Sequence, residues 1–211
     1  MNKKIHNPDL NSLRPDISIE KIKDGIKHSG YPLQVIISNH LENKFLVQQE
    51  WAYVDQDTES IRSIDILAEL MLYDPQDIKP KVRPSLNLLI ECKKSELPCV
   101  FFLSKNMIYP SKFPVIAGLP KDEISIITDD DASTFNHSII QTFSLCDHEF
   151  LKGSVKTCAT FTKCNRKGTN LELSGSEPFN GIVMPLTKTL NHLKKIETPK
   201  KSHCWLDCHS I

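Results

Sequence analysis

Two acidic residues and one lysine have the types and the spacing of a centre that hydrolyses phosphodiesters with the help of a metal ion. Asp65 stands between two isoleucines, and Glu91 and Lys93 lie at the end of an apolar segment. Side chains alternate along a strand, so Glu91 and Lys93 are expected on one face, with Cys92 directed into the core. If the two segments pair, Asp65 and Glu91 approach each other across the sheet. These three side chains are our candidate catalytic residues.

Two carboxylates at the edge of a core repel each other unless a cation lies between them. Mg²⁺ fits such a site because it takes oxygen ligands and keeps several waters, and Mn²⁺ is a reasonable substitute. A bound metal lowers the pKa of its water and polarises a phosphoryl oxygen. Lys93 would then orient the attacking water and stabilise charge on the scissile phosphate. The residues therefore favour Mg²⁺-dependent hydrolysis of nucleic acid.

The segments that must position these residues follow helical and strand-like patterns. Helices are expected at residues 18–27, 32–43, 132–143 and 177–195. Strands are expected at residues 45–54, 61–70, 86–93, 99–103 and 155–161. The first two strands would form a hairpin. The helix over 32–43 should bury the face that carries Leu33, Ile36, Ile37, His40 and Leu41.

The last of these helices contains a proline, Pro185, which should kink its axis or leave a hydrogen bond unmade. Ser176 is the expected N-cap of that helix. Ahead of it, residues 163–168 read as a basic turn.

A strand with Asp65, a loop, a hydrophobic strand and then Glu91-x-Lys93 resembles the signature of the PD-(D/E)XK nucleases. This superfamily includes restriction endonucleases and many repair nucleases. The resemblance covers residues 32–103 and includes the helix that precedes the first strands. It implies an α/β fold with a restriction endonuclease-like mixed central sheet flanked by helices. It also implies that Asp65 and Glu91 bind the metal, that the Cys92 carbonyl completes the shell and that Lys93 is the catalytic lysine.

The sequence departs from the family pattern at two points. Ile64 stands where many members have a proline. Many members also carry an acid on the first helix. Here Glu42 lies at the far end of the expected helix, and Gln34 near its start has no charge. A second metal site therefore has no clear ligand.

Length and composition are those of a globular chain with one real core. The 211 residues suit one domain with tails, and 39% are hydrophobic and 25% charged. We expect an N-terminal arm at 1–30, a nuclease-like domain at 31–197 and a C-terminal tail at 198–211. No apolar run is long enough for a membrane span, and the first residues do not resemble a secretory signal. An odd count of seven cysteines favours reduced thiols in the cytoplasm over a disulfide framework.

The net charge is zero but unevenly spread, because residues 151–211 hold ten basic and four acidic side chains. Basic side chains release counterions when they bind a phosphate backbone, so this part is a candidate DNA contact. The candidate contact residues are Arg62, Lys94, Lys163, Arg166 and Lys167. An ordinary solvated surface is the competing interpretation. Four His and Cys residues of the tail lie within seven positions, which is too close for the usual two-armed zinc site.

A second class of function stays open from the sequence alone. The same fold could be a catalytically inactive restriction endonuclease-like module that binds DNA or another protein. Metal binding that is lost in Asp65→Ala favours the enzyme, whereas DNA binding without metal dependence favours the module. The sequence also leaves open whether the chain forms a homodimer, as many enzymes that cut both strands do.

Overall fold

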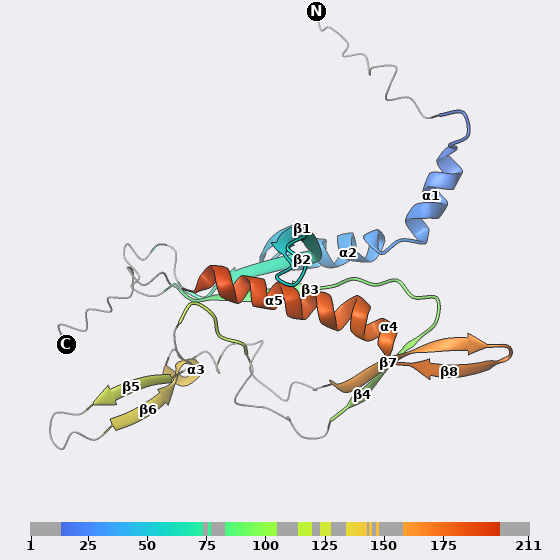
Figure 1. Ribbon diagram of the computed structural model, residues 1–211. Coiled ribbons are helices and arrows are strands. Elements are labelled where there is room, and N and C mark those ends of the chain that lie inside the picture. Colours follow the sequence, from blue (N-terminus) through green and yellow to red (C-terminus); the bar gives the residue numbers. More distant parts are fainter. Residues whose placement is uncertain are drawn as a thin grey trace, which may run out of the picture. The chain divides into compact units, whose positions relative to one another are not determined.

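The computed structural model describes residues 14–73, 76, 83–104, 114–119, 123–127, 134–142, 144, 147 and 158–198 (Figure 1). The chain divides into two compact units, which we describe one at a time. The first combines Met1–Trp51 with Ser63–Glu96, and the second combines Ala52–Arg62 with Leu97–Ile211. The residues expected to form one domain, 31–197, are thus shared between both units.

The first unit is built from two helices and the body of a three-stranded antiparallel sheet, in the order β1-β2-β3. Its elements are α1 Ile19–Lys27, α2 Tyr31–Leu41, β1 Leu46–Val54, β2 Ile61–Met71 and β3 Ser85–Ile90. Ser18 caps α1 by accepting a hydrogen bond from the Lys21 N–H, and Pro32 lies in the first turn of α2. Both helices and all three strands agree with the sequence prediction within a few residues.

A small hydrophobic core lies between α2 and the sheet. Its buried members are Phe45, Ile66, Ala68 and Cys92. Partly buried apolar side chains surround them: Ile37, Leu41, Val47, Leu70, Leu86, Leu88 and Ile90. Strands β2 and β3 are registered from Met71 opposite Ser85 to Ile66 opposite Ile90. One further step along this antiparallel register places Asp65 opposite Glu91.

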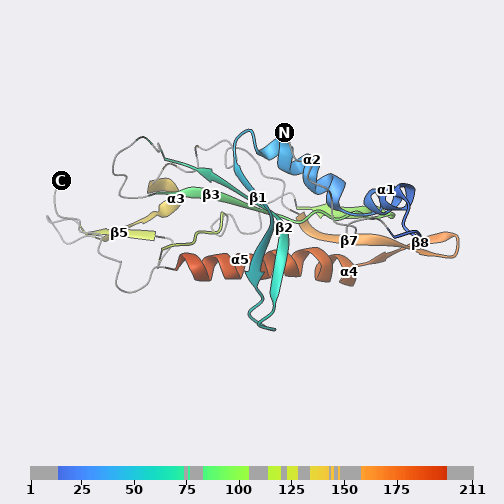
Figure 2. The same ribbon diagram turned by 90° about the horizontal axis from the view of Figure 1, so that it is seen from above.

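The second unit contains the tip of the β1–β2 hairpin and two more antiparallel sheets. One sheet has the order β4-β7-β8, with β4 Cys99–Leu103, β7 Cys158–Lys167 and β8 Asn170–Ser174. The other pairs β5 Glu123–Ile127 with β6 Thr134–Ser138, which α3 Ile139–Thr142 follows. A continuous helical stretch comes last: α4 Ser176–Pro178, the π-helical η4 Phe179–Val183 and α5 Met184–Glu197 (Figure 2).

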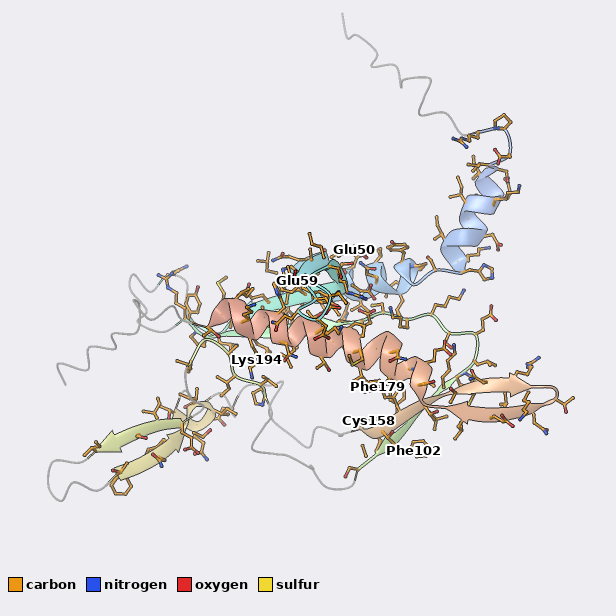
Figure 3. The ribbon with its side chains drawn as sticks, viewed as in Figure 1. Glu50, Glu59, Phe102, Cys158, Phe179 and Lys194 are labelled. Atoms are coloured by element: carbon orange, nitrogen blue, oxygen red, sulfur yellow. The ribbon has the colours of Figure 1, made fainter. Side chains whose placement is uncertain are left out.

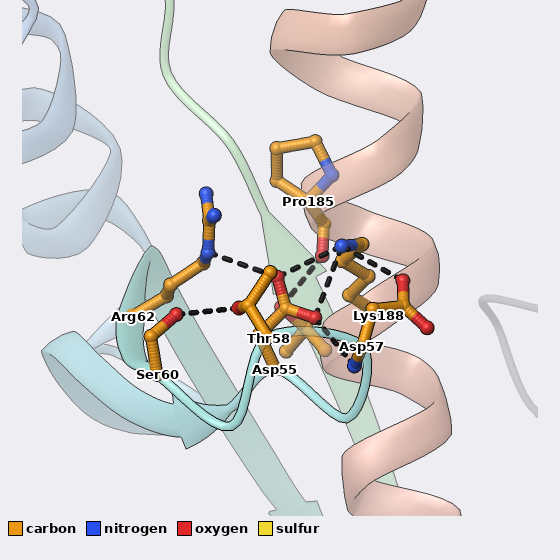
Figure 4. Close-up of polar contacts among 8 residues, drawn as sticks. Asp55, Asp57, Thr58, Ser60, Arg62, Pro185 and Lys188 are labelled. Carbon is orange, nitrogen blue, oxygen red and sulfur yellow. Dashed lines mark hydrogen bonds and ion pairs between the residues drawn. The ribbon is translucent and has the colours of Figure 1, made fainter.

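A buried acid organises the hairpin tip of the second unit (Figure 4). The Asp55 side chain is 0% exposed, and it accepts hydrogen bonds from Lys188 of α5 at 2.8 and 3.0 Å. The Arg62 guanidinium lies 2.9 Å from the same carboxylate. The hydrogen bond from Lys188 holds the pKa of Asp55 below its ordinary value, although burial opposes this. The contacts tie this tip to α5.

The irregular start of the last helix agrees with the expectation for Pro185. A proline has no N–H to donate to the preceding turn, and the π-helical segment η4 ends two residues before it. The predicted cap was wrong, because the N-cap is Gly175 and no side chain caps this end.

Two other sequence predictions were wrong because strand pairing overrides the local pattern, and one expected strand ends earlier than predicted. Of the described residues in the helix expected at 132–143, Thr134–Ser138 form a strand that pairs with Glu123–Ile127, and Ile139–Thr142 are helical. The basic turn expected at 163–168 is instead part of β7, between β4 and β8. The turn itself follows at Gly168, whose φ of 60° suits glycine. The third expected strand, 86–93, ends at Ile90, so Glu91, Cys92 and Lys93 follow the strand.

The fold class is mixed α/β, as expected, but the arrangement of strands differs from a single mixed central sheet. Within the described residues the strands form three small antiparallel sheets. In the same part of the chain, no helix has both the length and the apolar character that a membrane crossing requires. The cysteines among these residues, Cys92, Cys99, Cys158 and Cys164, are free thiols. The His and Cys residues of the tail lie outside the described residues.

Candidate active site

The first unit brings Asp65 to the Glu91–Lys93 segment. Asp65 lies on β2, beside the fully buried Ile64 and Ile66, so its backbone is fixed by the core. Its carboxylate accepts a hydrogen bond from the Cys92 N–H. Because Cys92 stands between the other two candidates, this bond holds the Glu91–Lys93 segment against β2 at Asp65. The convergence that the sequence predicted for Asp65 and Glu91 is therefore present in the geometry.

Glu91 and Lys93 form an ion pair with each other at the end of β3. The Glu91 side chain is only 5% exposed, whereas that of Lys93 is 46% exposed. The ammonium contacts Oε1 of Glu91. The other oxygen, Oε2, is buried and has no hydrogen-bond partner among the described residues. A buried carboxylate oxygen without a donor is costly, so this atom is a natural position for a cation.

Burial and the ion pair between Glu91 and Lys93 shift the pKa of each of these two residues in opposite directions. Burial, and next the charge of Asp65, raise the pKa of Glu91 above its usual range, although the ion pair with Lys93 opposes them. Burial lowers the pKa of Lys93, but the hydrogen bond and charge of Glu91 outweigh it and the pKa is raised overall. Lys93 is therefore an ammonium at neutral pH, which can donate hydrogen bonds and stabilise negative charge. Burial also raises the pKa of the Cys92 thiol, which stays protonated in the core.

The backbone after Glu91 is also held by a close approach of helix α2. A Cβ placed on Gly30 would lie 3.0 Å from the Cys92 carbonyl oxygen. Gly30 is the N-cap of α2, and its backbone angles are ordinary for any residue. Glycine is therefore favoured here because the Cys92 carbonyl leaves no room for a side chain, and not because of the backbone conformation. The Cys92 carbonyl faces this glycine, and its role as a metal ligand stays a prediction.

One further side chain that the sequence did not select, Gln34, reaches Asp65, and hydrogen bonds connect it to Glu50 and through Glu50 to Ser63. Gln34 of α2 is 3% exposed and donates to the Asp65 carbonyl at 3.1 Å and to Glu50 at 3.2 Å. The second oxygen of Glu50 accepts from the Ser63 hydroxyl at 3.0 Å. The sequence signal that could have identified Gln34 is its polarity on the inward side of an otherwise apolar helix.

The inward face of α2 differs in part from the predicted one. Ile37 and Leu41 pack against the core as predicted. Leu33 and Ile36 are exposed, as is His40, whereas Gln34 and Ser38 are buried. The prediction assumed that only apolar residues turn inward, but Gln34 has hydrogen-bond partners there that an apolar residue could not satisfy.

The candidate DNA contacts are mostly engaged in interactions within the protein. Arg62 pairs with Asp55, and the Lys94 ammonium donates to the Lys27 carbonyl. Lys163 and Lys167 lie 2.6 and 3.0 Å from glutamates of their own unit. Arg166 is exposed on β7. Their binding to nucleic acid stays a prediction.

The residues of this centre fit one Mg²⁺ ion held in its usual way. The described residues contain no cluster of three or more His, Cys, Asp or Glu side chains that could hold a metal. Mg²⁺ does not need such a cluster, because proteins commonly hold it with one or two carboxylates and leave several waters in place. Asp65 and Glu91 supply two, and the unpaired Glu91 Oε2 is the atom that a cation would satisfy.

The close approach of α2 predicts that Gly30→Ala disturbs the site while Gly25→Ala does not. The new methyl group must push the Cys92 backbone away, which costs about 1–3 kcal/mol of stability. A Cβ on Gly25, inside α1, meets nothing within 4 Å, so alanine there should be neutral or stabilising by up to about 1 kcal/mol. Denaturant unfolding of both variants measures the difference. Equal stability of the two would contradict the contact.

Comparison of the chain with models of protein families, with curated proteins and with solved structures gave no match. The proposal of a function therefore depends on the geometry of Asp65, Glu91 and Lys93.

Proposed function

We propose that this chain is a metal-dependent nuclease that hydrolyses phosphodiester bonds of nucleic acid, with DNA as the favoured substrate. The observation that carries the proposal is the unpaired, buried Oε2 of Glu91 beside the Asp65 carboxylate. Asp65 and Glu91 carry two negative charges at this partly buried site, and Lys93 balances only one of them. A divalent cation is the partner that would balance the other.

Asp65 and Glu91 would hold this ion, with the Cys92 carbonyl as a further ligand by resemblance. The preferred metal is Mg²⁺, with Mn²⁺ as a substitute, because the donors are all oxygens. When bound, such an ion supplies a water of lowered pKa and polarises the phosphoryl oxygen. The protein contributes rigidity, since β2 and the Cys92 N–H fix the Asp65 carboxylate.

Lys93 would act as a charged donor. Its raised pKa keeps it protonated, so it is suited to orient the attacking water and to stabilise the phosphate as charge accumulates on it. Its side chain is about half exposed, which leaves it accessible to a phosphate from solvent. In the absence of substrate the ammonium contacts Glu91, and this contact holds it at the site.

The order α2, β1, β2, β3 supports a restriction endonuclease-like core over residues 32–103, as the resemblance implies. The basic side chains Lys94, Lys163, Arg166 and Lys167, together with Arg62, are proposed DNA contacts. Those that already pair with acids would exchange these partners for phosphates, so their contribution should fall with salt.

A non-catalytic binding module is the second candidate. The Asp65 carboxylate already accepts from the Cys92 N–H, and Glu91 already pairs with Lys93, so part of the charge is satisfied internally. An assay on plasmid DNA distinguishes the enzyme from the binding module. The enzyme should cut only with Mg²⁺ or Mn²⁺ present and lose activity in Glu91→Ala, whereas the module should bind DNA equally well with or without metal.

Replacing Lys93 by alanine should abolish cleavage and leave DNA binding intact. Loss of one donor that stabilises developing charge typically lowers turnover by about 10²–10³-fold. One lysine is a minor part of the basic surface, so affinity for a plasmid fragment should change by no more than about threefold. Cleavage on gels and binding by fluorescence anisotropy test this, with Lys23→Ala of α1 as the matched loss of an exposed lysine. A loss of binding as large as the loss of cleavage would count against the role of Lys93.

The raised pKa of Glu91 predicts how the metal-free protein responds to pH. The folded state binds the Glu91 proton more tightly than the unfolded state, so the free energy of unfolding should rise as the pH falls through the raised pKa towards 4.5. Glu91→Gln resembles the protonated form, so this part of the pH dependence should disappear and the variant should be at least as stable at neutral pH.

Calorimetry with and without Mg²⁺ measures how much the metal stabilises the wild-type protein and Glu91→Gln. Mg²⁺ at about 100 times its Kd should stabilise the wild-type protein by about 2.7 kcal/mol and should not stabilise Glu91→Gln. Glu42→Gln, at the exposed C-cap of α2, is the control and should behave as the wild type. A metal-induced shift that survives in Glu91→Gln would exclude Glu91 as a ligand.

A further inference from the structure

Gln34 connects helix α2 and strand β1 to the backbone of Asp65. The Gln34 amide nitrogen donates to the Asp65 carbonyl at 3.1 Å and to Glu50 Oε1 at 3.2 Å. The hydroxyl of Ser63, two residues before Asp65, donates to Glu50 Oε2 at 3.0 Å. All of these residues belong to the first unit. Glu50 and Gln34 thus hold β2 at Ser63 and at Asp65.

The chemistry of Gln34 suits a donor and excludes an acid at this place. Its side chain is 3% exposed, so its polar atoms depend on partners inside the protein. Its amide nitrogen faces three acceptor atoms, which are the Asp65 carbonyl oxygen, Glu50 Oε1 and, at 3.5 Å, Gln49 Oε1. A carboxylate in place of the amide would be repelled by the Asp65 carbonyl and by the Glu50 carboxylate. This explains why helix α2 carries an uncharged glutamine at position 34 and not an acid.

The backbone of Glu50 is strained, although the residue lies inside a strand. Its φ is 52°, in the left-handed region that costs a side-chain-bearing residue about 1–3 kcal/mol. Both of its carboxylate oxygens are engaged, by Gln34 and by Ser63. Glu59 has a similar φ of 55°, but it lies outside the strands, between β1 and β2, where such angles are common (Figure 3). At Glu50 the left-handed backbone lies within a strand, and the side chain accepts a hydrogen bond from Gln34, which also donates to the Asp65 carbonyl.

We infer that Gln34 and Glu50 are positioning residues that fix Asp65 for metal binding and catalysis. The inference rests on the proposed nuclease function and extends it to residues that bind neither metal nor substrate. Glu50 is assigned a positioning role because one of its carboxylate oxygens accepts a hydrogen bond from Gln34 and the other accepts one from Ser63. The pair acts through the Asp65 carbonyl, which keeps the carboxylate of the same residue on the Cys92 N–H and opposite Glu91.

The test uses one variant at each position and a matched control for each. Gln34→Glu introduces repulsion, and Gln48→Glu adds the same charge at an exposed position of β1. Glu50→Gly removes the side chain and relieves the strained φ, and Glu59→Gly does the same between the two strands. Loss of residues that support a ligand typically costs 10–100-fold in metal affinity or activity.

For Gln34→Glu and Glu50→Gly we expect kcat to fall about 10–100-fold with the KM for DNA nearly unchanged. We also expect the Kd for Mn²⁺, measured by titration calorimetry on the metal-free protein, to rise about tenfold or more. Both controls should stay within about twofold of the wild type. Because glycine relieves strain, the melting temperature of Glu50→Gly should stay near that of the wild type, so instability would not explain its loss.

Two further measurements keep the inference testable if a variant folds poorly or the wild type proves inactive. Adding Glu50→Gln to Gln34→Glu removes one of the two repulsions and should restore part of the lost Mn²⁺ affinity. Hydrogen exchange of the Cys92 amide reports the position of Asp65 without metal or substrate, because that N–H donates to the Asp65 carboxylate. Its protection should fall in Gln34→Glu and Glu50→Gly and persist in both controls.

These measurements separate the two proposals. A wild-type protein that neither binds Mn²⁺ nor cuts DNA would end the nuclease proposal, and Cys92 protection would still decide the role of Gln34 and Glu50. If the wild type is active but both variants match their controls in kcat, Mn²⁺ affinity and Cys92 protection, the positioning role is overturned.

Discussion

Two carboxylates next to each other at the edge of a hydrophobic core require a positive charge, or one of them must take up a proton. In this protein Asp65 and Glu91 are two such carboxylates, and Lys93 pairs with Glu91 and so neutralises only one negative charge. Oε2 of Glu91 is buried without a hydrogen-bond partner among the described residues, and burial, together with the charge of Asp65, raises the pKa of this carboxyl. A protein that needed only stability would be better served by apolar residues here. The retained imbalance is the physical argument for a cation site.

The surrounding structure is arranged so that these groups cannot move apart to relieve the repulsion. The core residues on either side of Asp65 fix its strand, and the Cys92 N–H fixes its carboxylate. Gly30 lets the start of α2 approach the Cys92 carbonyl, and Gln34, one turn further along α2, reaches the Asp65 carbonyl. Helix α2 therefore contacts the backbone on both sides of the candidate centre. Preorganisation of this kind is what electrostatic catalysis requires.

The sequence was informative where local pattern decides structure. Strand alternation was enough to predict that Asp65 and Glu91 approach each other on condition that their strands pair, and the antiparallel pairing of β2 with β3 meets that condition. Helix α2 was located correctly and Ile37 and Leu41 turn inward as predicted, but the burial of Gln34 was missed, since it is buried for its hydrogen bonds and not for its hydropathy. The role of Glu50 could not be predicted either. Its left-handed backbone occurs at a residue type that gives no signal for it.

Outside the first unit, the sequence was less informative about where strands begin and end. Lys163 and Lys167 looked like parts of an exposed turn, but this segment extends β7 and pairs with the following strand β8, and the turn comes at Gly168. The ion pair of Lys167 with Glu172 depends on the register of that hairpin, and Lys163 pairs with Glu177 beyond it. The pairing of β4 with β7, by contrast, joins segments far apart in the chain, and no window of residues encodes it.

The most direct test of a cation site at Asp65 and Glu91 is a Mn²⁺ titration of the metal-free protein followed by electron paramagnetic resonance. The wild-type protein should bind one Mn²⁺ ion at this site. Asp65→Ala should weaken that binding by about 100-fold, and Asp24→Ala of the exposed helix α1 should leave it unchanged. Mn²⁺ binding of equal strength in the wild type and Asp65→Ala, or no binding by the wild type, would contradict the account.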